Sequence, residues 1–141
     1  MRGLWLSLAL MATAGAVRAA EMVQPGYWEA TDKILSPIQS TKIERRCITP
    51  ADVHKFMMGP SNHIYACTYP EQSAADGVIV FKGRCVDKKG RVVRIGGHGT
   101  YTATTLNLTA DVAFTLFGLP IAARASTDAH RIGDVCPSTD K

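Results

Sequence analysis

Residues 105–116 read Thr-Leu-Asn-Leu-Thr-Ala-Asp-Val-Ala-Phe-Thr-Leu, and this stretch decides the fold class. Apolar side chains stand at every second position from Leu106 to Leu116, and mostly polar ones stand between them. This period of two is typical of a β-strand with one dry face and one wet face. Gly118-Leu119-Pro120 predicts a turn, and residues 121–126 alternate again as the returning strand.

Shorter segments of the same character precede this strand, separated by turn-forming residues. Ser36-Pro37, Asp76-Gly77 and Asp87-Lys88-Lys89-Gly90 predict turns. Gly96-Gly97 and Gly99 are expected to end one strand before the next, Thr-rich strand begins. The predicted strands cover residues 27–35, 41–47, 78–86, 91–95 and 100–105.

One helix interrupts the strands. Thr49-Pro50-Ala51-Asp52 supplies a capping Thr, a Pro at the first helical position and an acid in the first turn, and Gly59-Pro60 ends the helix. We therefore expect a mainly β fold, with a single antiparallel meander sheet and one short helix near residues 50–58. The sheet is expected to be strongly curved, as a half-barrel or small barrel-like structure.

Composition and the N-terminal segment indicate where the protein works. The chain has 141 residues, 46% of them hydrophobic and 20% charged, which excludes a disordered chain and favours a single domain. Residues 1–19 resemble a signal peptide, with Arg2, an apolar run over 4–17 and cleavage after Ala19. That run would rise only about 21 Å as a helix, too short for a bilayer core of roughly 30 Å. We expect a domain of residues 20–141 that is periplasmic or secreted and has no transmembrane segment.

The four cysteines predict a disulfide framework, because an even number of cysteines in an oxidising compartment is usually paired. Cys67 and Cys85 are equidistant from Asp76 in the Asp-Gly turn, so a hairpin there would place them opposite each other. This favours Cys67–Cys85 and leaves Cys47 to pair with Cys136, although other connectivities stay open.

The hairpin pairing raises one conflict. It sets Glu71 opposite Phe81, on the face that is expected to be buried. Pro70 cannot donate to a β-ladder, so a bulge or an edge position there would turn Glu71 outward. The sequence leaves this choice open.

Several short motifs point to a family. They are Pro25-Gly26-Tyr27-Trp28-Glu29, Cys47-Ile48-Thr49-Pro50, the two central cysteines and Gly133-Asp134-Val135-Cys136. In their order and spacing the chain resembles the bacterial exported domain-of-unknown-function family thirty-six seventeen. The resemblance spans nearly the whole chain after the leader. It implies a small exported protein and supplies no catalytic residue.

Sequence motifs give no support for an enzyme. The chain contains no G-x-S-x-G elbow, no H-E-x-x-H and no phosphate-binding loop of known spacing. Gly96-Gly97-His98-Gly99 joins two predicted strands instead of opening a helix. Pairing all four cysteines also removes a thiolate nucleophile. We therefore expect a non-enzymatic protein that needs no cofactor.

Binding or structural support in the cell envelope is the favoured role. A curved sheet can hold a small apolar ligand between itself and the helix, while exposed strand edges can pair with an envelope protein. The alternative is that the aromatic side chains simply fill the core. The candidate lining residues are Trp28, Tyr27, Phe56, Phe81 and Phe114.

Copper binding is the second functional hypothesis. His54, Met57, Met58 and His63 lie within ten residues, and thioether and imidazole ligands suit copper in an exported protein. The alternative is that the methionines belong to the buried face of the helix. The short basic runs Arg45-Arg46 and Lys88-Lys89 are too short and too far apart in sequence to indicate nucleic acid or lipid.

Overall fold

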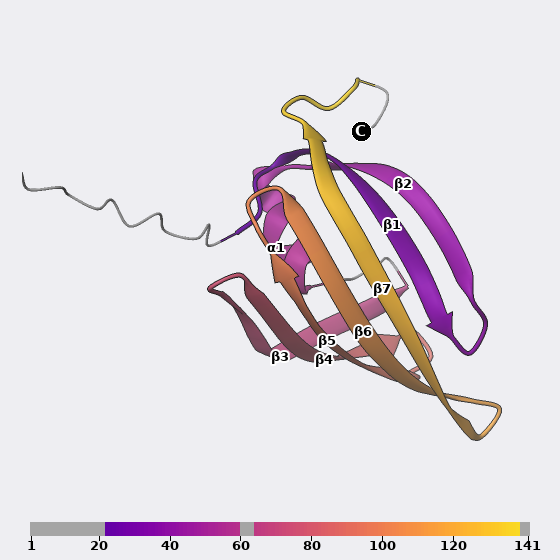
Figure 1. The fold of residues 1–141 in the computed structure, drawn as a ribbon. Helices are drawn as coiled ribbons and strands as arrows, with labels where there is room; N and C mark the ends of the chain where they lie inside the picture. The colour runs from indigo at the N-terminus through magenta and orange to yellow at the C-terminus, as the bar shows by residue number, and fades with distance from the viewer. Residues whose placement is uncertain (1–21, 60–63, 139–141) are drawn as a thin grey trace, which may run out of the picture.

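The computed structural model describes residues 22–59 and 64–138. Within them, seven strands form one sheet and one short helix, α1, covers part of one face (Figure 1). The elements are β1 (Gly26–Ser36), β2 (Ser40–Ile48), α1 (Val53–Met58), β3 (Tyr65–Ala75), β4 (Val78–Asp87), β5 (Val92–Tyr101), β6 (Thr105–Leu116) and β7 (Leu119–Gly133).

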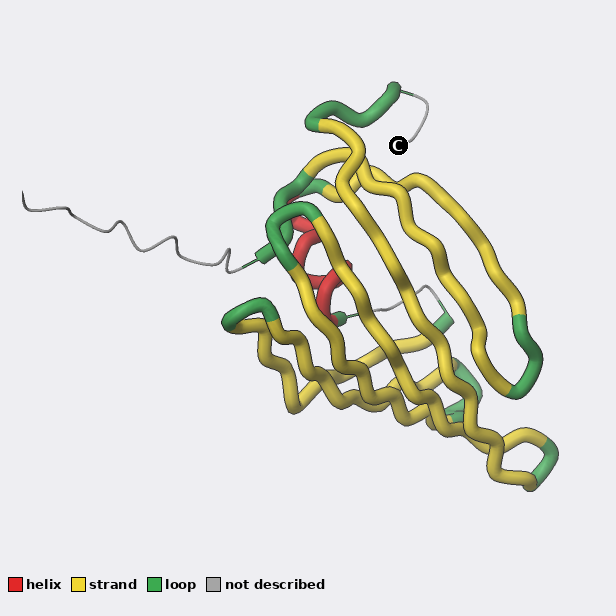
Figure 2. The backbone as a smooth tube through the Cα atoms, in the orientation of Figure 1, coloured by secondary structure: helices red, strands yellow, loops and turns green. Residues whose placement is uncertain are grey.

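The strands lie in the order β2-β1-β7-β6-β5-β4-β3, and all neighbouring pairs are antiparallel. Strands β3 to β7 form the expected meander, and the β1–β2 hairpin then joins the β7 side (Figure 2). The mainly β class is thus confirmed. The prediction of a strongly curved, barrel-like sheet is wrong, because the sheet is neither closed nor strongly curled. The chain between the two edge strands, β2 and β3, carries α1 instead of a ladder that would close a barrel.

The expected interruption at the glycines is also wrong. Strand β5 runs without a break through Gly96, Gly97 and Gly99. A Cβ atom on Gly97 would overlap the Phe81 ring, and one on Gly99 would overlap the Asn107 backbone. These two glycines therefore allow close approach of neighbouring strands and do not end the strand.

The last hairpin differs from its prediction in position and length. Its turn is Phe117-Gly118, where both residues have positive φ, so β7 already begins at Leu119. Strand β7 then continues to Gly133, well beyond the predicted return strand of residues 121–126. It is this long because it pairs with β6 on one side and with β1 on the other.

A β-bulge resolves the conflict in the β3–β4 hairpin. The turn is Asp76-Gly77, and the pairing from there places Glu71 opposite Lys82, on the exposed face. The register then shifts beyond Glu71, at the position of the predicted bulge. This one-residue shift is what brings Cys67 directly opposite Cys85.

Both expected disulfides are present. Cys67–Cys85 links β3 to β4, and Cys47–Cys136 links β2 to the segment after β7. The described part of the chain has no free cysteine. Two disulfides indicate an oxidising compartment. The expected signal peptide of residues 1–19 lies outside the described residues.

The helix begins as its sequence predicts. Thr49 and Asp52 form a capping box, in which the Thr49 backbone N–H donates to the Asp52 carboxylate at 3.3 Å. A 3₁₀ turn, Pro50–Asp52, leads directly into α1. The buried side chains of α1 are Val53, Met57 and Met58.

The core lies between α1 and one end of the sheet. Its largest fully buried side chains are Trp28, Phe81, Met57, Ile79 and Leu106. Burial fades along β6, from 1% exposure at Leu106 to 46% at Leu116, because the strand runs away from the helix. The alternation of the sequence therefore marks a face that is fully buried only at one end.

Candidate ligand-binding site

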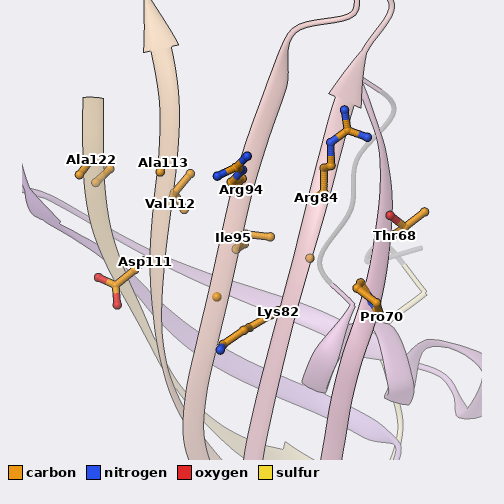
Figure 3. Close-up of a pocket in the computed structure, with 13 residues that line it drawn as sticks. Thr68, Pro70, Lys82, Arg84, Arg94, Ile95, Asp111, Val112, Ala113 and Ala122 are labelled. Carbon is orange, nitrogen blue, oxygen red and sulfur yellow. The ribbon is translucent and has the colours of Figure 1, made fainter. Parts of the chain in front are cut away.

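The face of the sheet that points away from α1, called here the outer face, carries a shallow trough across β3 to β7 (Figure 3). Its volume is about 550 Å³. Gly96 has no side chain and those of Ala113 and Ala122 are short, whereas Lys82 and Arg94 beside them have long side chains. A hollow forms where short side chains stand next to long ones. We call it the outer trough.

Two arginines face each other across adjacent strands in the outer trough. Arg84 of β4 and Arg94 of β5 are direct partners in the antiparallel register, and both are exposed. Residues directly opposite on one face of a sheet have Cβ atoms about 5 Å apart, so two like charges there repel each other.

The other charged cross-strand pairs on the outer face are matched. Directly opposite partners of opposite charge are Glu29 and Arg45, Glu71 and Lys82, and Asp111 and Arg124. Their ion pairs measure 3.2, 3.7 and 2.7 Å between nitrogen and oxygen. The arginine pair departs from this pattern.

The acidic groups near the outer trough already have cationic partners. A hydrogen bond from Arg124 lowers the pKa of the Asp111 carboxyl below its ordinary value. Lys82 lies near Glu71. Within residues 22–59 and 64–138, Arg84 and Arg94 form no ion pair with a carboxylate. The outer trough therefore presents two guanidinium groups whose charge is not neutralised.

This arrangement suits an anion that carries an apolar part. A guanidinium group offers planar pairs of N–H donors that match carboxylate and phosphate oxygens. The backbone and alanine floor offers apolar surface beside them. The lining also includes Thr68, Lys82 and Asp111, which add a hydroxyl, an ammonium and a carboxylate to the outer trough.

A second cleft lies where the sequence predicted a ligand, between α1 and the sheet. It has a volume of about 530 Å³, and Phe56, Leu106 and Arg46 contribute to its lining. The guanidinium of Arg46 donates hydrogen bonds to Asp32 and Glu44. The charge of Arg46 is thus already compensated, which leaves Lys55 as the other cation of this inner cleft, against two facing guanidinium groups in the outer trough.

The aromatic residues proposed as a ligand lining are dispersed. Trp28 and Phe81 are fully buried in the core, and Phe56 packs edge-on against Trp28 with ring centroids 5.4 Å apart. Of the five, only Phe56 lines the inner cleft. Tyr27 and Phe114 are half-buried. The structure does not bring these side chains around one cavity.

The residues of the copper hypothesis are also separated by burial. His54 is exposed on α1, whereas Met57 and Met58 belong to the core. His63 lies outside the described residues. In the part of the chain that the structure describes, no three His, Cys, Asp or Glu side chains are grouped as metal ligands would be. Copper binding here stays a prediction.

Sequence reasoning did not single out Arg84 and Arg94. The predicted turn of residues 87–90 pairs residue 84 with residue 93, one position away from its observed partner, residue 94. Counting outward from that turn would have placed Arg84 and Arg94 on opposite faces, so the pair depends on the observed register of β4 and β5. The small residues of the floor are spread over three strands and carry no local signal.

Comparison with known protein families shows which family the chain belongs to. The family described as "Protein of unknown function (DUF3617)" matches residues 23–136, a range that includes all seven strands. The chain belongs to this family. The resemblance drawn from the sequence motifs is thus confirmed. Neither a curated protein nor a solved structure is significantly similar to this DUF3617 protein. None of its described helices has the length and apolar character needed to cross a bilayer.

Proposed function

We propose that the protein is a non-enzymatic binding protein of the bacterial cell envelope, periplasmic or secreted, whose outer trough holds a small apolar ligand bearing an anionic group. The observation that carries the proposal is the unmatched cross-strand pair of Arg84 and Arg94. Like charges directly opposite each other weaken a sheet. A bound carboxylate or phosphate would attract both guanidinium groups and so offset the repulsion between them.

The shape of the outer trough supports the same ligand class. Its volume of about 550 Å³ lies within the range of roughly 300–1,000 Å³ that is typical of small-molecule sites. The guanidinium groups are complementary to the charged end of an amphipathic anion, and the small-residue floor is complementary to its apolar part. In the inner cleft, the guanidinium of Arg46 is already bound to Asp32 and Glu44, so it is less available for the same task.

Export is supported by independent observations. The two disulfides fit an oxidising compartment, and the N-terminal sequence has the three parts of a signal peptide. Protein recovered from the periplasm or medium should begin at Ala20. An N-terminus at Met1 in the exported protein would contradict cleavage.

Ligand binding is tested with a fluorescent long-chain carboxylic acid, cis-parinaric acid, and with its uncharged methyl ester. We expect the acid to bind and the ester to bind at least tenfold more weakly. The double variant Arg84→Gln with Arg94→Gln should lose at least tenfold in affinity for the acid. Arg45→Gln is the matched control, because Arg45 lies on the outer face but outside the outer trough.

Two outcomes would contradict the proposal. The first is equal binding of acid and ester, which would remove any role for the guanidinium groups. The second is an equal effect of Arg45→Gln and of the double variant, which would indicate a general charge effect. Circular dichroism of each variant confirms that the fold is retained.

A further inference from the structure

Three hairpin turns lie at the end of the sheet farthest from the core. The antiparallel order places the β1–β2, β4–β5 and β6–β7 turns at one end, and the β3–β4 and β5–β6 turns at the other (Figure 1 and Figure 2). We call the first end the hairpin end. It is the end at which the burial of β6 fades.

The hairpin end exposes large apolar side chains on two separate turns. Phe117 is 95% exposed at the β6–β7 turn, and Leu119 beside it is 64% exposed. On the β1–β2 turn, Ile38 is 80% exposed and Leu35 is 40% exposed. Isolated apolar side chains on a surface are ordinary, but a group of them at projecting tips marks an interaction site.

The conformation of Phe117 makes this choice of residue informative. Phe117 and Gly118 have φ of 49° and 78°, the left-handed pair of a two-residue hairpin turn. Asp76 and Gly77 form the other such turn among the described residues, with nearly the same angles of 53° and 77°. Asn, Asp and Gly are favoured at the first position, and a bulky aromatic is not. The turn therefore carries a Phe against its own conformational preference.

The third turn supplies positive charge. Lys88 and Lys89 are exposed, and neither forms an ion pair within the described residues. The three turns contain no Asp or Glu, and Asp87, the last residue of β4, is buried and bound to Arg91 at 2.6 Å. The basic run Lys88-Lys89 is only two residues long, but the fold places it at the same end of the sheet as the apolar tips.

We propose that the hairpin end docks the protein onto an anionic phospholipid membrane, with Phe117, Leu119 and Ile38 entering the headgroup region and Lys88 and Lys89 contacting the lipid phosphates. Apolar tips and lysines at one end of the sheet are complementary to such a surface, because it combines apolar depth with negative charge. The tips project from separate hairpins, and a deformable lipid surface can accept each of them.

Docking is tested by co-sedimentation of the full exported chain with vesicles of phosphatidylcholine alone and of phosphatidylcholine with 30% phosphatidylglycerol. We expect binding to the anionic vesicles that weakens at least tenfold in high salt. Phe117→Asn should weaken it at least tenfold while retaining the fold, because Asn suits the turn. Val135→Asn is the matched control, since Val135 is 82% exposed beyond the other end of β7.

A second measurement locates the contact. Phe117→Trp should shift its fluorescence to the blue on anionic vesicles, and the difference spectrum against the unsubstituted protein isolates this signal. Lys88→Glu should weaken binding several-fold, while Lys55→Glu on α1 makes the same charge change away from the hairpin end. No sedimentation with either vesicle, equal loss with Val135→Asn, or an unshifted tryptophan would each overturn the proposal. Binding of another protein at these tips with no vesicle binding would assign the hairpin end to a protein partner instead.

The outer trough and the hairpin end are separable in these experiments. The double variant Arg84→Gln with Arg94→Gln should lose parinaric acid, whereas Phe117→Asn should lose vesicles and retain the acid. Either proposal can thus fail while the other stands.

Discussion

Replacing one of the facing arginines by glutamate should stabilise the protein while destroying its proposed site. Arg94→Glu converts a like-charged cross-strand pair into an opposite-charged one. Cross-strand charge pairs contribute roughly 0.2–1 kcal/mol, and like pairs cost a similar amount. The substitution removes the repulsion between two arginines and adds the attraction of a Glu–Arg pair. Because solvent screens exposed charges, we expect the free energy of unfolding to rise by about 1 kcal/mol. For a domain of this size that is a rise in Tm of roughly 4 °C.

Urea unfolding at low salt measures this change, with the fluorescence of the fully buried Trp28 as the signal. Because the effect is electrostatic and exposed, it should shrink toward zero in 1 M salt, where the Debye length is about 3 Å. Arg45→Glu is the matched control, since it breaks the pair with Glu29 and should destabilise the protein by a similar amount. A less stable Arg94→Glu protein, or a change that salt does not affect, would refute the reasoning.

Three further predictions concern the fold. Gly97→Ala should cost about 1–3 kcal/mol in urea unfolding because its Cβ overlaps an aromatic ring, while Gly133→Ala, which meets no atom within 4 Å, should be nearly neutral. Loop-closure entropy makes the Cys47–Cys136 bridge worth about 4.6 kcal/mol and the Cys67–Cys85 bridge about 3.2 kcal/mol. Pairwise replacement by alanine should therefore lower stability more for the first, and the reverse order in urea unfolding would contradict this. Hydrogen bonds from the Arg91 backbone hold the pKa of Asp87 below its ordinary value, so its contribution is present above about pH 4 and lost as pH falls through the lowered pKa. Asp87→Asn should flatten this part of the stability curve, and an unchanged acid limb measured by circular dichroism would count against it.

Much of the fold could be predicted because its signals are local. The alternation of residues 106–116, the Asp-Gly turn and the capped helix each need only neighbouring residues to be recognised. The cysteine pairing followed from the hairpin arithmetic, although it holds only because of the bulge next to Glu71. A local pattern thus gave the elements and the pairing that those elements impose.

The wrong predictions concern segments whose structure is determined by residues far away in the sequence. Gly97 looked like a strand break, but the Phe81 ring on the neighbouring strand requires it. The second half of β7 carries no strong alternation, and it is extended because β1 and β6 pair with it from both sides. The degree of curvature also depends on the whole sheet, which no single segment encodes.

The candidate site was harder to predict than the fold for the same reason. The arginines of the outer trough come from two strands, and its floor comes from three. Lys88 and Lys89 looked insignificant in sequence, and only the topology places them at the same end of the sheet as Phe117. The predicted aromatic lining lay mostly in the core, because a small sheet with one short helix needs those rings for packing.

The pairing of β1 with β7 has a consequence for biosynthesis. The first strand of the sheet has to wait for the last one, about a hundred residues later, before its ladder can form on that side. Contacts of such high sequence separation slow folding. A chain emerging N-terminus first would therefore display Trp28 and its neighbours to chaperones until synthesis of the final strand is complete.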